Sequence, residues 1–137
     1  MTGDINELIL YRTKRSLETL REAKTMIDNG FWNASVNRVY YSCYYVVSAL
    51  LLVKSIETVS HKGIRQMFGL HFVQTGLVSK EDGRFFSDLY DRRQTGDYDD
   101  FIDYDKVLAN QLFNHADEFV KRMNELIKRP DSRNFHP

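Results

Sequence analysis

Residues 31–54 read FWNASVNRVYYSCYYVVSALLLVK and form the most apolar stretch of the chain. Apolar side chains recur in it every three or four residues, the spacing that puts them on one face of an α-helix. The recurring positions are Val36, Val39, Tyr40, Cys43, Tyr44, Val47, Leu50 and Leu51. We therefore predict a helix that begins at about Phe31 or Asn33 and ends near Lys54. Because it is the most apolar element, we expect it at the centre of the fold.

Four further helices are predicted around this stretch. Each shows helical spacing and is bounded by residues typical of helix ends: capping side chains at the start, or glycine or proline at the end. The predicted ranges are 4–29, from Ser60 to near Gly76, from Ser79 onward, and from Asp103 or Asp105 to residues 128–130. No convincing alternation of period two indicates a strand. The sequence therefore predicts an all-α antiparallel up-and-down helical bundle of four to five helices.

Length and composition indicate one globular domain. The chain has 137 residues, of which 28% are charged and 42% hydrophobic, ordinary values for a domain with a single core. We expect residues 1–130 to form this domain and residues 131–137 to be a loose tail. The apolar run at 46–53 is far shorter than a membrane-spanning helix, so no membrane partner is predicted. The absence of a secretory signal and the single cysteine, Cys43, favour a cytoplasmic protein.

Charge and ligand spacing restrict the binding partners. Nineteen basic residues balance nineteen acidic ones, so nucleic-acid binding would need a local patch, or two patches joined in a dimer. Neither His61 nor His71 has another metal-ligating side chain at ligand spacing, and we expect His61 to be a surface or capping residue. The aspartates near residue 100 lack the glycine and glutamate of an EF-hand loop. The sequence therefore predicts no metal and no cofactor.

The candidate functional segment lies at the end of the fourth predicted helix. Residues 85–104 read FFSDLYDRRQTGDYDDFIDY, with two adjacent cations at Arg92 and Arg93. Arginines near a helix C-terminus interact favourably with the negative end of the helix dipole. Arg92 can also pair with Asp88, four residues earlier on the helix. On this interpretation both arginines only stabilise the helix.

A second interpretation makes the same segment a binding site. The helical pattern is lost at residues 94–96, which end in a glycine. A break there would turn the chain back, so that Asp97 and Tyr98 would share a pocket with Arg93. The sequence leaves both interpretations open.

Arg38 interrupts the apolar face of the second helix. Tyr41 and Tyr45 follow it one and two turns along the same side. The side chain can lay its stem on the apolar surface and keep its charge in water. Alternatively it points into a polar cleft, because a charged side chain is rarely buried without a partner. Both alternatives remain open.

The order of these motifs resembles the HEPN domain family, the higher-eukaryote and prokaryote nucleotide-binding domains. Residues 34–44, ASVNRVYYSCY, resemble the second helix of that family. Residues 60–64, SHKGI, resemble the S-H-x-G start of its next helix, and residues 89–98, LYDRRQTGDY, resemble its L-R-Q-x-x-D-Y segment. The chain is similar in particular to small stand-alone bacterial HEPN proteins that accompany a minimal nucleotidyltransferase.

This resemblance implies an all-α bundle, usually a homodimer, in a family that contains metal-independent ribonucleases and toxins of toxin-antitoxin pairs. Active members carry an arginine followed, four to six residues later, by a histidine, and two subunits contribute this motif to one cleft. Arg93 matches the arginine, but Tyr98, Asp99 or Asp100 stands where the histidine would be. In some members the nucleotidyltransferase modifies a nearby tyrosine with AMP, for which Tyr98 is the candidate by analogy.

The resemblance favours a nucleotide- or RNA-binding module that forms one half of a nucleotidyltransferase-associated toxin-antitoxin-like system. Arg93 would bind a phosphate bidentately, with Arg92 and Arg38 as further cations. Tyr41 and Tyr98 would offer stacking faces to a base. The expected partners are a second copy of the chain, the nucleotidyltransferase, and a nucleotide or RNA.

Two alternative functions are compatible with the same residues. The first is a metal-independent ribonuclease in which Arg93 works with Asp97, Tyr98 or the remote His61 in place of the missing histidine, because cleavage through the 2′-hydroxyl requires proton transfer near neutral pH. The second is a non-catalytic interaction or dimerisation protein, whose tyrosine-rich helix is an interface.

Overall fold

The regular secondary structure of the described residues is all helical, with no strand. The computed structural model describes the backbone of residues 2–98 and 103–129, and the side chains of residues 3–93 and 103–129. The elements in chain order are α1 (Thr2–Asp28), α2 (Trp32–Val53), α3 (His61–Phe68), the π-helix η1 (Gly69–Val73), α4 (Lys80–Tyr98) and α5 (Lys106–Lys128). The predicted all-α helical bundle is therefore confirmed. The predicted tail, residues 131–137, lies outside the described residues.

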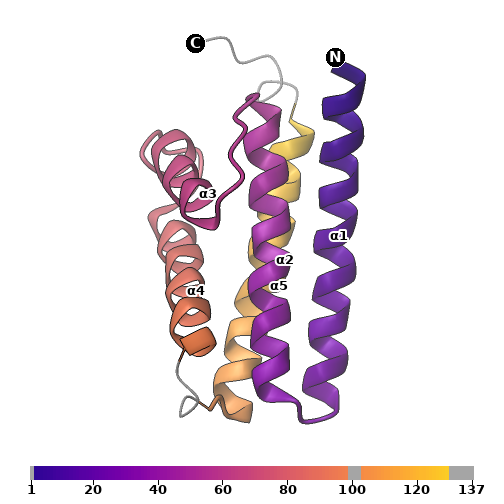
Figure 1. Cartoon of the computed structure of the whole chain (residues 1–137), viewed down its shortest axis with the longest axis vertical. Coiled ribbons are helices and arrows are strands. Elements are labelled where there is room, and N and C mark those ends of the chain that lie inside the picture. The colour runs from indigo at the N-terminus through magenta and orange to yellow at the C-terminus, as the bar shows by residue number, and fades with distance from the viewer. Residues whose placement is uncertain (1, 99–102, 130–137) are drawn as a thin grey trace.

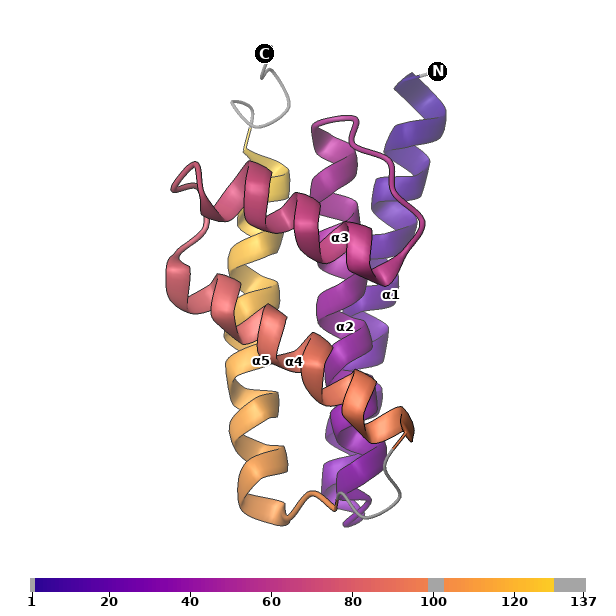
Figure 2. The same ribbon diagram turned by 60° about the vertical axis from the view of Figure 1, so that its left-hand side comes forward.

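Helix α2 is the centre of the bundle, as its composition predicts. The long helices α1, α2 and α5 run side by side, and α3 and α4 cross the side of α2 and α5 that faces away from α1 (Figures 1 and 2). Helix α2 contacts each of the other four α-helices. Val39, Cys43, Val46 and Val47 on α2 are fully buried, so most of the apolar face is removed from water on folding.

Helix α2 also has the length and composition of a membrane-spanning helix. It is the one described helix with these properties, and 67% of its most apolar window is buried inside the bundle. Neighbouring helices therefore cover the apolar face that a lipid bilayer would otherwise contact. Such burial is typical of the core helix of a bundle.

Capping side chains fix the starts of three helices. Ser60 Oγ accepts the Gly63 N–H at 2.9 Å, and Ser79 Oγ accepts the Asp82 N–H at 3.1 Å. Asp105, one of the two residues predicted to cap the last helix, accepts the Leu108 N–H at 2.8 Å. These bonds satisfy backbone donors that have no partner within the helix.

Gly63 leaves no room for a side chain beside the α3 cap. A Cβ at residue 63 would overlap Thr58 Oγ1 and lie 2.8 Å from Ser60 Oγ. We therefore expect Gly63→Ala to lower the free energy of unfolding by about 1–2 kcal/mol, because the overlap outweighs the better helix propensity of alanine. Gly69→Ala is the matched control, since a Cβ there meets nothing within 4 Å. Urea unfolding should show opposite signs for the two variants; a gain in stability for both would contradict the close packing at Gly63.

The predicted break at residues 94–96 is wrong, because α4 continues through Gly96 to Tyr98. A single glycine costs a helix only about 1 kcal/mol relative to alanine, which the continuing backbone hydrogen bonds offset. Asp97 therefore lies one helical turn after Arg93, and the chain does not turn back before it. The side chains of residues 94–98 and all of residues 99–102, including Asp99 and Asp100, lie outside the described part.

A buried carboxylate joins α4 to α5. Asp82, in the first turn of α4, is only 3% exposed. Arg122 of α5 donates to both of its oxygens, from Nε at 2.8 Å and from Nη2 at 2.9 Å. His115 Nε2 lies 3.4 Å from Asp82 Oδ1, and the His115 ring stacks on Phe85 at 3.7 Å. This two-pronged ion pair fixes the position of α4 against α5.

Candidate functional site

Four tyrosines of α2 form a continuous group of rings, which we call the tyrosine cluster: Tyr40, Tyr41, Tyr44 and Tyr45. Residues four apart on a helix lie on the same side. Tyr44 and Tyr45 therefore lie one helical turn after Tyr40 and Tyr41 on the same side of α2. The ring centres are 5.2 Å apart for Tyr40 and Tyr41, 6.0 Å for Tyr41 and Tyr44, and 5.9 Å for Tyr44 and Tyr45. Tyr40 is buried and the other three are half-buried, so the cluster has one edge in the core and one accessible to solvent.

His61 packs against the tyrosine cluster. Its Nδ1 lies 2.7 Å from the Tyr40 hydroxyl oxygen, and its ring stacks on Tyr44 with the ring centres 4.3 Å apart. His61 is thus in the capping region of α3, as expected, but it also makes contacts with α2 that the sequence did not predict. The residue does stand in the first turn of α3, but the start of α3 lies against α2. The S-H-x-G motif at residues 60–63 predicts the position of His61 at the start of a capped helix, but it does not predict the contact with α2.

Arg93 of α4 reaches the same cluster. Its Nε donates to the Tyr41 hydroxyl oxygen at 3.3 Å. The guanidinium carbon lies 5.6 Å from the Tyr40 ring centre and 5.7 Å from that of Tyr41, within the range of cation–π attraction. The structure therefore brings together two of the predicted binding residues, Arg93 and Tyr41, from helices far apart in sequence.

Arg38 approaches Tyr41 from its own helix. Its guanidinium carbon lies 5.4 Å from the Tyr41 ring centre, and its Nη1 is 3.3 Å from Glu22 Oε1 of α1. Nη2 also donates to the Asn37 side chain at 2.8 Å. The Arg38 side chain is 30% exposed, so its guanidinium lies between a carboxylate and an aromatic ring and still reaches solvent.

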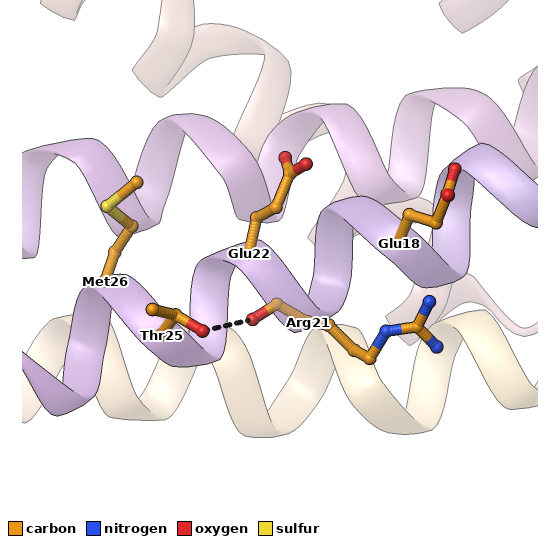
Figure 3. Close-up of a pocket in the computed structure, with 5 residues that line it drawn as sticks. All are labelled: Glu18, Arg21, Glu22, Thr25 and Met26. Atoms are coloured by element: carbon orange, nitrogen blue, oxygen red, sulfur yellow. Dashed lines mark hydrogen bonds between the residues drawn. The ribbon is translucent and has the colours of Figure 1, made fainter.

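An open pocket of about 380 Å³ lies on α1 and includes Glu22, the ion-pair partner of Arg38 (Figure 3). Its lining includes the carboxylates of Glu18 and Glu22, together with Arg21, Thr25 and Met26. Two carboxylates around one hollow repel a phosphate. This pocket is therefore a poor anion site.

Arg15 is a further cation at the cluster that the sequence did not single out. Its guanidinium carbon lies 5.3 Å from the Tyr45 ring centre. A hydrogen bond with Tyr45, assisted by Glu18, raises the pKa of Arg15. Arg15 also pairs with Glu18, three residues later on α1, at 3.4 Å. The contact with Tyr45 is thirty residues away along the chain and has no local signal.

Burial raises the pKa of two tyrosines of the cluster, Tyr40 and Tyr44. Desolvation raises the pKa of Tyr40 well above its usual value, and the nearby charge of Arg93 opposes this only in part. Desolvation likewise raises the pKa of Tyr44, against the opposing charges of Arg12 and Arg93. Both phenols are therefore protonated at neutral pH. They can donate hydrogen bonds and stack, but they do not act as bases.

The remaining predicted residues lie at the end of α4. Arg92 is half-buried and, among the described contacts, makes no pair with Asp88. The backbones of Asp97 and Tyr98 belong to α4, but their side chains lie outside the described part, so their roles stay predictions. Within residues 3–93 and 103–129, no group of three or more His, Cys, Asp or Glu side chains could hold a metal ion.

Fold and site together define an all-α bundle in which tyrosines of the central helix α2 contact His61 of α3 and Arg93 of α4. The HEPN domain model matches residues 9–126, and the chain belongs to the HEPN family. A UPF0332 protein of Thermotoga maritima is 34% identical over 122 residues, which cover 89% of this chain and 92% of the relative. Two proteins of Methanocaldococcus jannaschii, named "Putative toxin MJ0142" and "Putative toxin MJ0605", are each 31% identical. The aligned residues cover 88% of this chain and 80% of the first relative, and 93% of this chain and 95% of the second.

Proposed function

We propose that this HEPN protein binds a nucleotide or single-stranded RNA at the tyrosine cluster. The observation that carries the proposal is that two guanidinium groups, those of Arg93 and Arg38, lie against the half-buried ring of Tyr41. Guanidinium groups bind phosphate oxygens in pairs of parallel hydrogen bonds. Exposed aromatic faces stack with bases irrespective of sequence. Cations beside an accessible ring are the combination that a single-stranded ligand requires.

The biological role in this proposal is that of a toxin-like protein with a partner. Two relatives carry the word toxin in their names. The resemblance to stand-alone HEPN proteins adds a minimal nucleotidyltransferase as the proposed partner, with Tyr98 as the proposed site of AMP attachment. We further propose a cytoplasmic homodimer in which both copies of Arg93 face one cleft. Chemical crosslinking in solution that placed the two copies of Arg93 on opposite outer surfaces would contradict this dimer.

A metal-independent ribonuclease is the second candidate, and the position of His61 favours it. Cleavage through the 2′-hydroxyl needs a group that exchanges a proton near neutral pH and a cation that binds the phosphate. His61 and Arg93 both contact Tyr40 and Tyr41. His61 belongs to α3 and Arg93 to α4. The fold thus brings an arginine and a histidine to the same two tyrosines, although the two residues do not share one sequence motif.

Thermal unfolding tests the binding proposal directly. A ligand at a hundred times its dissociation constant stabilises the native state by about 2.7 kcal/mol, which raises the melting temperature by several degrees. We expect single-stranded RNA oligonucleotides to produce this shift and a duplex of the same length to produce a smaller one, since its bases are not available for stacking. The shift should shrink as salt rises, because phosphate contacts release counterions. Equal shifts with duplex and single strand would contradict base stacking.

A further inference from the structure

A second pair of one cation and one ring lies next to Tyr41 along α2. The guanidinium carbon of Arg15 is 5.3 Å from the Tyr45 ring centre, and that of Arg38 is 5.4 Å from the Tyr41 ring centre. The ring centres of Tyr41 and Tyr45 are 6.5 Å apart, and both residues are half-buried. The same arrangement of cation and ring therefore occurs twice where α1 and α2 pack side by side (Figure 1).

This repeat matches the chemistry of a nucleic-acid strand, in which each unit carries one phosphate and one base. Four residues of an α-helix advance by about 6 Å along its axis, which is longer than the rise of about 3.4 Å per nucleotide in a stacked duplex strand. A single strand with its bases apart can follow this step, because each base can then contact its own ring. A mononucleotide has one base and can use only one of the two pairs.

Each of the two arginines has a carboxylate of α1 beside it. Arg15 Nη1 lies 3.4 Å from Glu18 Oε1, and Arg38 Nη1 lies 3.3 Å from Glu22 Oε1. Arg38 also donates to the neutral side chain of Asn37. The four charged side chains are 27–45% exposed, and such solvated ion pairs contribute little to stability. The carboxylates therefore compete with a phosphate for the two arginines, but they do not hold them tightly.

The ion pair of Arg122 shows the contrast within the same protein. Arg122 donates to both oxygens of Asp82, at 2.8 and 2.9 Å, and that carboxylate is 4% exposed. Arg15 and Arg38 each contact their carboxylate through one nitrogen, at a distance beyond the roughly 2.7–2.9 Å of a strong charged hydrogen bond. A phosphodiester can replace these weaker contacts, because a guanidinium binds two phosphate oxygens at once.

We propose that Arg15 and Tyr45 form a second nucleotide subsite, which makes the ligand a single strand of two or more nucleotides rather than a mononucleotide. Arg15 binds the phosphate that follows the one at Arg38, and the Tyr45 ring contacts the base that follows the one at Tyr41. The inference rests on the proposed nucleotide- or RNA-binding function and extends it to the length of the ligand.

The length of the ligand tests the inference in the wild-type protein. The probes are 2′-O-methyl uridine mono-, di- and tetranucleotides with a 5′-phosphate, which cannot be cleaved through a 2′-hydroxyl and gain one phosphate and one base with each unit. Isothermal titration calorimetry measures their affinities without a label. We expect the dinucleotide to bind about ten-fold more tightly than the mononucleotide. Equal affinities of these two probes would overturn the second subsite, whereas the proposed function would stand.

Substitutions at the second subsite should act on the longer ligands only. We expect Arg15→Gln and Tyr45→Leu each to weaken dinucleotide binding about five-fold to ten-fold, and to change mononucleotide binding less than about two-fold because the first subsite is intact. Arg21→Gln is the matched control, since it removes one charge from an exposed residue of the same helix. A loss for Arg21→Gln as large as that for Arg15→Gln, or the same loss for both probes, would overturn the subsite.

The competing carboxylate provides a test in the opposite direction. Glu18→Gln removes the negative charge beside Arg15 and keeps the size of the side chain, so dinucleotide binding should become about three-fold tighter. Glu7→Gln removes the same charge from an exposed residue of the same helix and should leave binding as in wild type. Equal affinities of these two variants would overturn the place of Arg15 at a phosphate. If wild type binds none of the probes, the proposed function itself fails, and the second subsite fails with it.

Discussion

Arg122→Met is expected to lower the free energy of unfolding by about 3 kcal/mol, because the buried carboxylate of Asp82 loses both hydrogen bonds from Arg122 and keeps only the longer contact with His115. The Asp82 side chain is 4% exposed, whereas that of Arg122 is 47% exposed. Only the carboxylate therefore lacks water when the pair is broken. Methionine keeps most of the apolar stem of the arginine, so the loss is electrostatic rather than a loss of packing. Urea unfolding followed by circular dichroism measures the change.

Two matched variants identify the buried carboxylate as the cause. Lys121→Met removes a neighbouring cation of α5 that pairs with Asp117 at 3.1 Å on the surface, and such an exposed pair contributes little to stability. Asp82→Asn should cost less than Arg122→Met, since the remaining arginine is hydrated. The double variant should be more stable than the sum of the two single losses predicts. Equal midpoints for Arg122→Met and Lys121→Met would contradict the structural role of the pair.

Arg93→Ala is expected to weaken binding of single-stranded RNA about thirty-fold, or about 2 kcal/mol. This is the size of a lost charge-assisted contact with phosphate. The measurement is fluorescence anisotropy with a labelled uncleavable oligonucleotide. Arg93→Lys keeps the charge but not the planar fork of donors, so its affinity should lie between those of wild type and Arg93→Ala.

Arg84→Ala provides the control for net charge. Arg84 is an exposed residue of the same helix, and its loss removes one positive charge away from the tyrosine cluster. We expect it to bind RNA nearly as wild type does. If Arg84→Ala and Arg93→Ala weakened binding equally, RNA would be attracted by overall charge, and the proposed site would be wrong.

The same variants separate the three functional classes. A ribonuclease cleaves RNA in the presence of a chelator, and Arg93→Ala abolishes cleavage. Equal cleavage by both proteins indicates a contaminating nuclease. A binding module retains RNA without cleaving it. An interaction protein binds no RNA, and Arg93→Ala then only lowers its stability, because the contacts with Tyr40 and Tyr41 are lost.

The helices were predictable because their signals are local. The spacing of apolar residues in α2, the capping residues Ser60 and Ser79, and the glycine at residue 30, which adopts φ +78°, each act within a few residues. The break at Gly96 was predicted wrongly by the same kind of reasoning. A glycine lowers helix propensity by a small amount, whereas the continuation of α4 depends on the sum of its backbone hydrogen bonds.

The candidate site was predictable only in part. Its cations and rings, Arg93, Arg38 and Tyr41, stood out because charged and aromatic residues at these positions do not fit a simple apolar face. The sequence named Arg93 and Tyr41 as binding residues of one site, but it did not predict that the two side chains contact each other. The contacts of His61 and Arg15 with the tyrosine cluster were not predicted, since their partners are on another helix and no spacing rule connects them.

The sequence by itself determined which segments are helical, where most of them begin, and which helix is the most buried, since backbone hydrogen bonding and apolar periodicity are properties of neighbouring residues. Only the tertiary structure decided three contacts between residues far apart in the sequence. His61 bonds to Tyr40, 21 residues away, and Arg93 donates to Tyr41, 52 residues away. Arg122 donates to Asp82, 40 residues away. These contacts depend on how the helices pack around α2. Packing is set by the fit of whole faces against one another, which no single segment encodes.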